Sequence, residues 1–165
     1  MNPLDNVALR PEREEDRSFL ETLYASTREQ ELAPVDWSAE KKLEFLRVQF
    51  AMQHAYYHQV YPSARYDVIE LNGEAVGRLY VDRTAEELRI LDIALVSSVR
   101  GQGIGGALMT ALMDEAAAQA RTVGLSVERS NAARRLYERL GFETCEETEV
   151  YLHLAWRSAK AAACC

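Results

Sequence analysis

Hydrophobic and polar positions repeat with two different periods along the chain, and each change of period marks an expected element. Residues 7–10 form a short strand-like run. The acids that follow Pro11 favour a helix start, because the positive end of the helix dipole stabilises negative side chains. A second helix is expected after Ser38, where apolar side chains recur at helical spacing, and Pro62 ends it.

The period changes to two in the middle of the chain. The segment YDVIELNGEAVGRLYVD contains two strand-like runs around Asn72-Gly73, a dipeptide that supplies the positive φ angles of a type I′ hairpin turn. Residues 88–96 are apolar on both faces except at Arg89 and Asp92. This pattern predicts a central strand that is covered on both sides.

Helices and strands alternate over the last third of the chain. A helix that begins in a glycine-rich stretch carries one apolar face and is expected to end at Gly124. A strand at 125–128, a helix at 131–140 and a final strand at 149–156 follow. The order β-α-α-β-β-β-α-β-α-β predicts an α/β or α+β fold, in which helices lie on the faces of a mixed sheet.

Composition and charge narrow the class of protein. No repeat or linker divides the chain, so we expect a single domain over residues 1–165, with 158–165 as a frayed tail.

A net charge of -7 disfavours a nucleic-acid partner, and no apolar run approaches the length of a membrane span. The start lacks the features of a signal peptide, and the three cysteines, of which Cys164 and Cys165 are adjacent, make no disulfide framework. We therefore expect a cytoplasmic protein without a membrane partner, and a homodimer is compatible with the sequence.

The stretch RGQGIGGAL at 100–108 raises the question of what its glycines hold. A P-loop needs a lysine where Ala107 and Leu108 stand, so that interpretation fails. A G-x-G-x-x-G pattern is present, but four residues separate it from the preceding strand, which makes a dinucleotide-binding oxidoreductase the weaker alternative. The pattern R-x-x-G-x-G instead opens a helix with backbone N–H groups that can surround a pyrophosphate, and Arg100 adds positive charge.

Two segments, IALVSSVRGQGIGGALM and SNAARRLYERLGF, together resemble the GNAT superfamily of acyl-CoA-dependent N-acyltransferases. The resemblance spans nearly the whole chain in element order. It implies a mixed, mostly antiparallel sheet with helices on both faces. Its central parallel strands, 88–96 and 125–129, are expected to splay apart around the pantetheine arm of acetyl-CoA.

The resemblance also implies which residues contact the donor. Backbone groups at Leu95 and Val96 would meet the pantetheine and the thioester carbonyl, and a free N–H group there would stabilise the oxyanion. Asn131 is a preferred helix N-cap type, and the family suggests that it also touches CoA. The region implied for the pyrophosphate comprises Arg100, Gly101, Gln102, Gly103, Ile104, Gly105 and Gly106.

Two side chains are candidates for catalysis. Tyr137 is either a core aromatic or, as in the family, the acid that protonates the departing thiolate. Asp92 is either the base that deprotonates the amine or a structural acid paired with an arginine such as Arg78 or Arg89. Where other family members carry a glutamate base, this chain has Ser126, and Glu128 is a substitute on the same face of the strand.

His54 and His58 have the i, i+4 spacing that can hold a metal ion. No third ligand is evident in the sequence, so we expect no metal, and we expect both to mix core and pocket wall with Tyr56, Tyr57 and Tyr61.

The sequence therefore predicts an N-acetyltransferase that moves an acetyl group from acetyl-CoA to a primary amine by direct attack in a ternary complex. The acceptor is expected to be a small molecule or a peptide. The acidic N-terminal half beside a more basic half favours a cationic acceptor. A domain that binds acyl-CoA as a sensor, without turnover, is the first alternative.

Overall fold

The structure is a computed structural model, and it describes residues 2–158. The strands are β1 (Val7–Pro11), β2 (Arg65–Leu71), β3 (Glu74–Arg83), β4 (Glu87–Leu95), β5 (Thr122–Glu128), β6 (Glu143–Glu147) and β7 (Tyr151–Arg157). The helices are α1 (Arg17–Leu32), α2 (Ala39–Val60), α3 (Ile104–Ala118) and α4 (Arg134–Arg139), with short 3-10 turns η1 (Glu14–Asp16) and η2 (Ser97–Val99).

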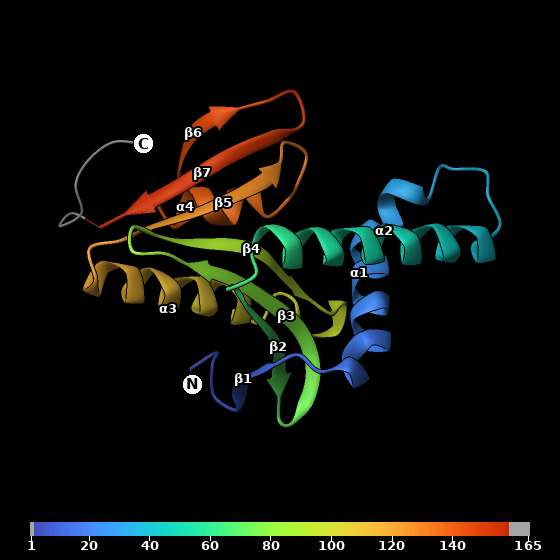
Figure 1. The fold of residues 1–165 in the computed structure, drawn as a ribbon, viewed down its shortest axis with the longest axis horizontal. Coiled ribbons are helices and arrows are strands. Elements are labelled where there is room, and N and C mark those ends of the chain that lie inside the picture. The colour runs from blue at the N-terminus through green and yellow to red at the C-terminus, as the bar shows by residue number, and fades with distance from the viewer. Residues whose placement is uncertain (1, 159–165) are drawn as a thin grey trace.

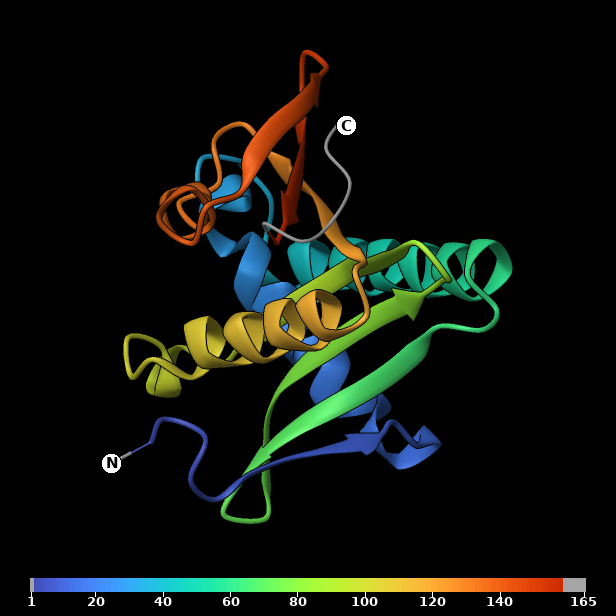
Figure 2. The ribbon, with the colours of Figure 1, turned by 90° about the vertical axis from the view of Figure 1, so that its left-hand side faces the viewer.

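All seven strands form one sheet in the order β1-β2-β3-β4-β5-β7-β6 (Figure 1). Only β4 and β5 are parallel, and every other neighbouring pair is antiparallel. Helix α3 covers one face of this sheet, and α1 and α2 cover the other (Figure 2). The predicted fold class is confirmed.

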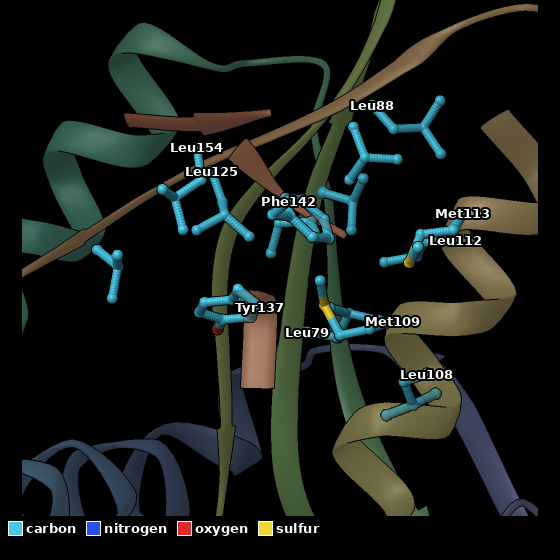
Figure 3. Packing of buried hydrophobic residues seen from close by; sticks show 14 of the residues in the cluster. Leu79, Leu88, Leu108, Met109, Leu112, Met113, Leu125, Tyr137, Phe142 and Leu154 are labelled. Atoms are coloured by element: carbon cyan, nitrogen blue, oxygen red, sulfur yellow. The ribbon is translucent and has the colours of Figure 1, made fainter. Parts of the chain in front are cut away.

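Each face of the sheet has its own hydrophobic core. The larger core joins α3 to the sheet and includes Tyr137 and Phe142 from the region of α4 (Figure 3). The smaller core lies between α1 and α2 and contains Tyr24 and Phe50. Burial of these side chains supplies the main driving force for the fold. Within residues 2–158, no helix combines the length and the apolar character needed to cross a membrane.

Residue type explains the local backbone conformation at three turn or cap positions. Asn72 and Gly73 have φ angles of 53° and 82° between β2 and β3. Ser38 caps α2 by accepting a hydrogen bond from the backbone N–H of Lys41 at 3.1 Å. Gly141 has φ 96° just after α4. These positions follow from residue type alone, because few residues tolerate positive φ or cap a helix well.

Other predicted boundaries are wrong. Gly124 lies inside β5, and α3 ends earlier because Ala120 takes the positive-φ position with φ 54°. The Glu87 carboxylate on the neighbouring strand occupies the space that a Cβ atom on Gly124 would take. Pro11 is the last residue of β1 rather than a helix start.

Strand β6 was not expected, because its sequence ETCEE is exposed throughout and shows no apolar alternation. Cys145 on this strand is disulfide-bonded, a pairing that the sequence did not predict. The predictions for Cys164, Cys165 and residues 159–165 fall outside the described residues.

The parallel pairing of β4 with β5 is short, and this determines where the site lies. It covers only Glu87 to Ile90 on β4. Past that point β4 stays on β3 as far as Leu95, whereas β5 stays on β7 as far as Glu128. The register of β4 on β3 shifts at the same place, since Leu91 has no partner on β3. A β-bulge therefore accompanies the divergence of the two central strands.

Hydrogen bonds of the Asp16 carboxylate connect the segment before α1 to β1, at the edge of the sheet. Asp16 is 8% exposed and receives two hydrogen bonds from Arg10 of β1, both at 2.8 Å. The backbone N–H of Arg13 donates to the same carboxylate at 2.7 Å. The hydrogen bonds from Arg10 hold the pKa of Asp16 below its usual value.

Because folding lowers the pKa of Asp16, its stabilising effect is complete above the pKa of an unfolded aspartate, about 4. The effect is lost as the pH falls through the lower pKa of the folded state. We predict that Asp16→Asn costs about 1–3 kcal/mol of unfolding free energy at pH 7, and that the difference from the wild type narrows below about pH 4. Urea unfolding of both proteins between pH 2 and pH 7 measures this.

Glu138→Gln is the matched control, because it breaks the exposed ion pair of Glu138 with Arg134 on α4. It should cost about 0.5 kcal/mol or less. A deficit of Asp16→Asn that stays the same from pH 7 to pH 2 contradicts the proposed role of the carboxylate.

Candidate active site

A cavity of about 750 Å³ lies where β4 and β5 diverge. Its walls come from both faces of the sheet: Tyr24 and Tyr57 belong to α1 and α2, whereas Tyr137 belongs to the core on the side of α3. The cavity therefore crosses the sheet through the gap between the two strands. This is the gap that the sequence resemblance implied for the pantetheine arm.

Asp92 lies in this cavity and is paired with Arg78 of β3. The Arg78 side chain is 3% exposed, and it also donates to the side-chain oxygen of Gln53 on α2 at 2.9 Å. Its guanidinium carbon lies 4.9 Å from the ring centre of Tyr80. Of the two predicted arginine partners, Arg78 is the one observed, whereas Arg89 pairs with Glu87. A buried arginine and a carboxylate that open into a cavity form a typical functional-site arrangement.

Tyr137 is 7% exposed, and its ring packs against Phe142 with a centroid distance of 5.9 Å. In Figure 3 its hydroxyl lies at the outer edge of the packed side chains. No residue between 2 and 158 forms a hydrogen bond with this hydroxyl, which faces the cavity. Burial, and then the negative charge of Asp92, raise the pKa of Tyr137 to about 12. The ring thus serves the core, while the hydroxyl keeps its proton at neutral pH and is available to a ligand.

Sequence reasoning missed His153, which faces Ser126 across β7 and β5. The Ser126 hydroxyl oxygen and the His153 Nδ1 atom lie 2.6 Å apart, and both residues line the cavity. The only sequence signal was a polar side chain in an otherwise alternating final strand. Glu128 also lines the cavity, but Arg28 of α1 binds its carboxylate at 3.1 Å.

One of the two N–H groups predicted as oxyanion donors at the end of β4 is already engaged. The backbone N–H of Val96 donates to the carbonyl of Val76 at 2.8 Å, which leaves the N–H of Leu95. Backbone N–H groups alternate between the two edges of a strand, so that of Leu95 points away from β3, toward the gap. The N–H of Ile93 points the same way, and sequence reasoning did not select it. The carbonyl of Leu95 accepts a hydrogen bond from Arg100 Nε at 2.9 Å.

The glycine loop leads into the first turn of α3. Gly101 and Gly103 have φ angles of 76° and 85°, which only glycine adopts readily. Gly103 is the N-cap residue, and no side chain caps this end of the helix. The first N–H groups of α3 therefore point outward without acceptors, at the positive end of the helix dipole. This end of α3 does not line the cavity but adjoins Leu95, whose side chain lies 3.8 Å from the Cβ position of Gly105.

Asn131 lines the cavity on the chain segment between β5 and α4. Its side-chain oxygen accepts a hydrogen bond from the backbone N–H of Ala133 at 2.8 Å. The helix itself begins at Arg134, three residues later than predicted, so Asn131 caps the turn that precedes it. The oxygen is occupied in this way, and its amide group remains available to a ligand.

Helix α2 forms a wall of the cavity with Tyr56 and Tyr57, and Tyr61 follows at its end. The hydroxyl of Tyr57 donates to the carbonyl of Leu91, the bulged residue of β4, at 3.0 Å. Burial raises the pKa of Tyr57 well above its usual value. His54 and His58 do not line the cavity, so their predicted place in the pocket wall is wrong.

The sequence matches the profile of the Acetyltransferase (GNAT) domain over residues 53–144. This match includes β4, the glycine loop and α4. No curated protein sequence matches the chain significantly.

Solved structures share the fold. The PaiA N-acetyltransferase from Thermoplasma acidophilum, in complex with coenzyme A, has a TM-score of 0.69 and 14% identity, with 92% of this chain and 99% of that chain aligned. An acetyltransferase from Thermus thermophilus has a TM-score of 0.67 and 18% identity over 96% of this chain and 100% of that one. Mycobacterium smegmatis RimJ, in complex with CoA-disulfide, has a TM-score of 0.59 and 21% identity over 92% and 82% of the two chains.

The family profile covers more than half of the chain, and the fold, the diverging strands and the glycine loop at the start of α3 agree with it. The chain therefore belongs to the GNAT acetyltransferase family and is an acyltransferase enzyme.

Proposed function

We propose that the protein transfers an acetyl group from acetyl-CoA to a primary amine by direct attack in a ternary complex. The observation that carries this proposal is the cavity that crosses the sheet between β4 and β5. On the side of α1 and α2 the cavity contains Asp92 and tyrosine side chains, where an amine can approach. The uncapped N–H groups at the start of α3 lie next to Leu95 of β4, outside the cavity, and suit the pyrophosphate of CoA.

The donor contacts follow from these elements. The first turn of α3 and the loop from Arg100 to Gly106 bind the pyrophosphate, and Asn131 adds its side-chain amide. The pantetheine arm lies along the free edge of β4. The N–H groups of Ile93 and Leu95 stabilise the oxyanion, since both point into the gap.

The reaction needs two proton transfers. The amine nitrogen attacks the thioester carbon and loses a proton. The C–S bond then breaks, and the thiolate takes the proton of the Tyr137 hydroxyl. The products are an acetylated amine and free CoA thiol.

We propose that His153 is the general base that accepts the proton of the amine, through the Ser126 hydroxyl. Asp92 and Glu128 each share their charge with an arginine, whereas no described residue forms an ion pair with His153. Imidazole is also the most frequent general base in enzymes. Asp92 has the role of attracting and orienting the amine beside the thioester.

Release of free thiol from acetyl-CoA, followed across a panel of primary amines, tests the function. We predict turnover with at least one amine, and a rise of Tm with acetyl-CoA but not with NAD. Gly105→Val should abolish both effects, because its side chain blocks the approach to α3. Beyond its own turn of helix, the nearest protein atom to the new Cβ is on Leu95 at 3.8 Å, so the fold tolerates the change. For a cationic acceptor, kcat/KM should fall as salt rises.

Binding of acetyl-CoA without turnover on any amine would instead favour a sensor domain. Equal stabilisation by NAD would contradict the donor assignment.

Tyr137→Phe removes only the hydroxyl and keeps the ring in the core. We predict that kcat falls by about 100-fold while the affinity for acetyl-CoA and Tm stay near those of the wild type. Tyr137→Leu is the comparison variant, and its Tm should also fall because it loses the ring contact with Phe142. An unchanged kcat in Tyr137→Phe returns this residue to a purely structural role.

His153→Gln tests the base. We predict a fall of kcat/KM by about 100-fold, because the group that accepts the proton is gone. Ser126→Ala should reproduce this effect, since it interrupts the same proton path. Wild-type kcat/KM in both variants would show that another group accepts the proton.

A further inference from the structure

Three side chains with metal-binding atoms meet outside the cavity. Glu12 follows β1, and His54 and His58 lie one turn apart on α2. The Glu12 Oε1 atom lies 3.6 Å from His54 Nε2 and 3.5 Å from His58 Nε2. The ligand atoms of all three residues lie within 4.8 Å of one another. The third ligand that the sequence did not reveal is therefore present, brought from a distant part of the chain.

The distances from Glu12 to the two histidines match the spacing of ligands around a tetrahedral metal ion. Zinc binds histidine nitrogen and carboxylate oxygen at about 2.0–2.2 Å, which places neighbouring ligand atoms about 3.3–3.6 Å apart. The two nitrogen–oxygen distances lie within this range. Two histidines and one glutamate also form a known zinc ligand set, in which water fills the fourth position.

Neighbouring residues hold the three side chains in this arrangement. The ring of His54 stacks on Phe50 with a centroid distance of 5.6 Å, and that of His58 stacks on Tyr66 at 4.0 Å. The Tyr80 hydroxyl donates to the second carboxylate oxygen of Glu12 at 2.6 Å. Such outer contacts orient the ligands and reduce the entropy lost on binding.

We propose that Glu12, His54 and His58 bind one divalent transition-metal ion of the zinc type. The ion joins the segment after β1 to α2. Gln53 and Tyr57 on the same helix face the cavity, so the ion also supports one wall of the active site. This proposal does not depend on the acyl transfer, because binding of the ion can be measured without it.

The test uses the full chain after removal of metal with a chelator. Titration with zinc chloride, followed by calorimetry, should show one tight site per chain and a rise of Tm by several degrees. Cobalt(II) should give the visible absorption bands of a tetrahedral site. Thiolate ligands would add intense ultraviolet bands, so the spectrum separates this site from the cysteines.

Glu12→Gln is the sharpest variant, because it keeps the shape of the side chain and a hydrogen-bond acceptor for Tyr80. It should weaken metal binding by about 100-fold, and His58→Ala, at a half-exposed position, should do the same. His153→Gln is the matched control. It replaces the third histidine of the chain, which is not a proposed ligand, and should bind the metal as the wild type does. No binding to the wild type, equal binding by Glu12→Gln, or thiolate bands would each overturn the proposal.

Discussion

The arrangement of the site depends on one extra residue in β4. Leu88 and Ile90 face the core under α3, and regular alternation would send Asp92 to the same face. Because Leu91 has no partner on β3, the alternation is reversed, and Asp92 lies opposite Tyr80 on the face of α1 and α2. Pairing with β5 ends at the same point. The bulge thus lies where β4 and β5 separate, and it places the Asp92 carboxylate in the cavity between them.

The ion pair of Arg78 and Asp92 offsets the energetic cost of this arrangement. A buried arginine alone would be strongly unfavourable, and loss of either partner leaves an uncompensated charge. Rings of Tyr24, Phe50 and Tyr80 surround the guanidinium, and Gln53 adds a hydrogen bond. The pair therefore links β3 and β4 to both helices of this face. One side of α2 serves the cavity, while another presents the two histidines to Glu12.

Features that depend on neighbours in the sequence were predictable. The hairpin at Asn72-Gly73 and the cap at Ser38 follow from the conformations that these residue types prefer. The uncapped start of α3 follows from the glycine pattern in the same way. Gly124 misled the prediction because it resembles a helix stop, whereas it lies inside β5, beside Glu87 of the neighbouring strand.

The sequence by itself determined the class of fold, the glycine loop with its helix, and the positions of Asp92 and Tyr137 in their elements. Periodicity, turn residues and short motifs carry this information within a few residues. Only the tertiary structure decided that Arg78 neutralises Asp92, that Val76 occupies the N–H of Val96, and that Ser126 meets His153. It also brought Glu12 to the histidine pair. These contacts join distant segments through strand register and a bulge, and a shift of one residue in a strand exchanges its two faces.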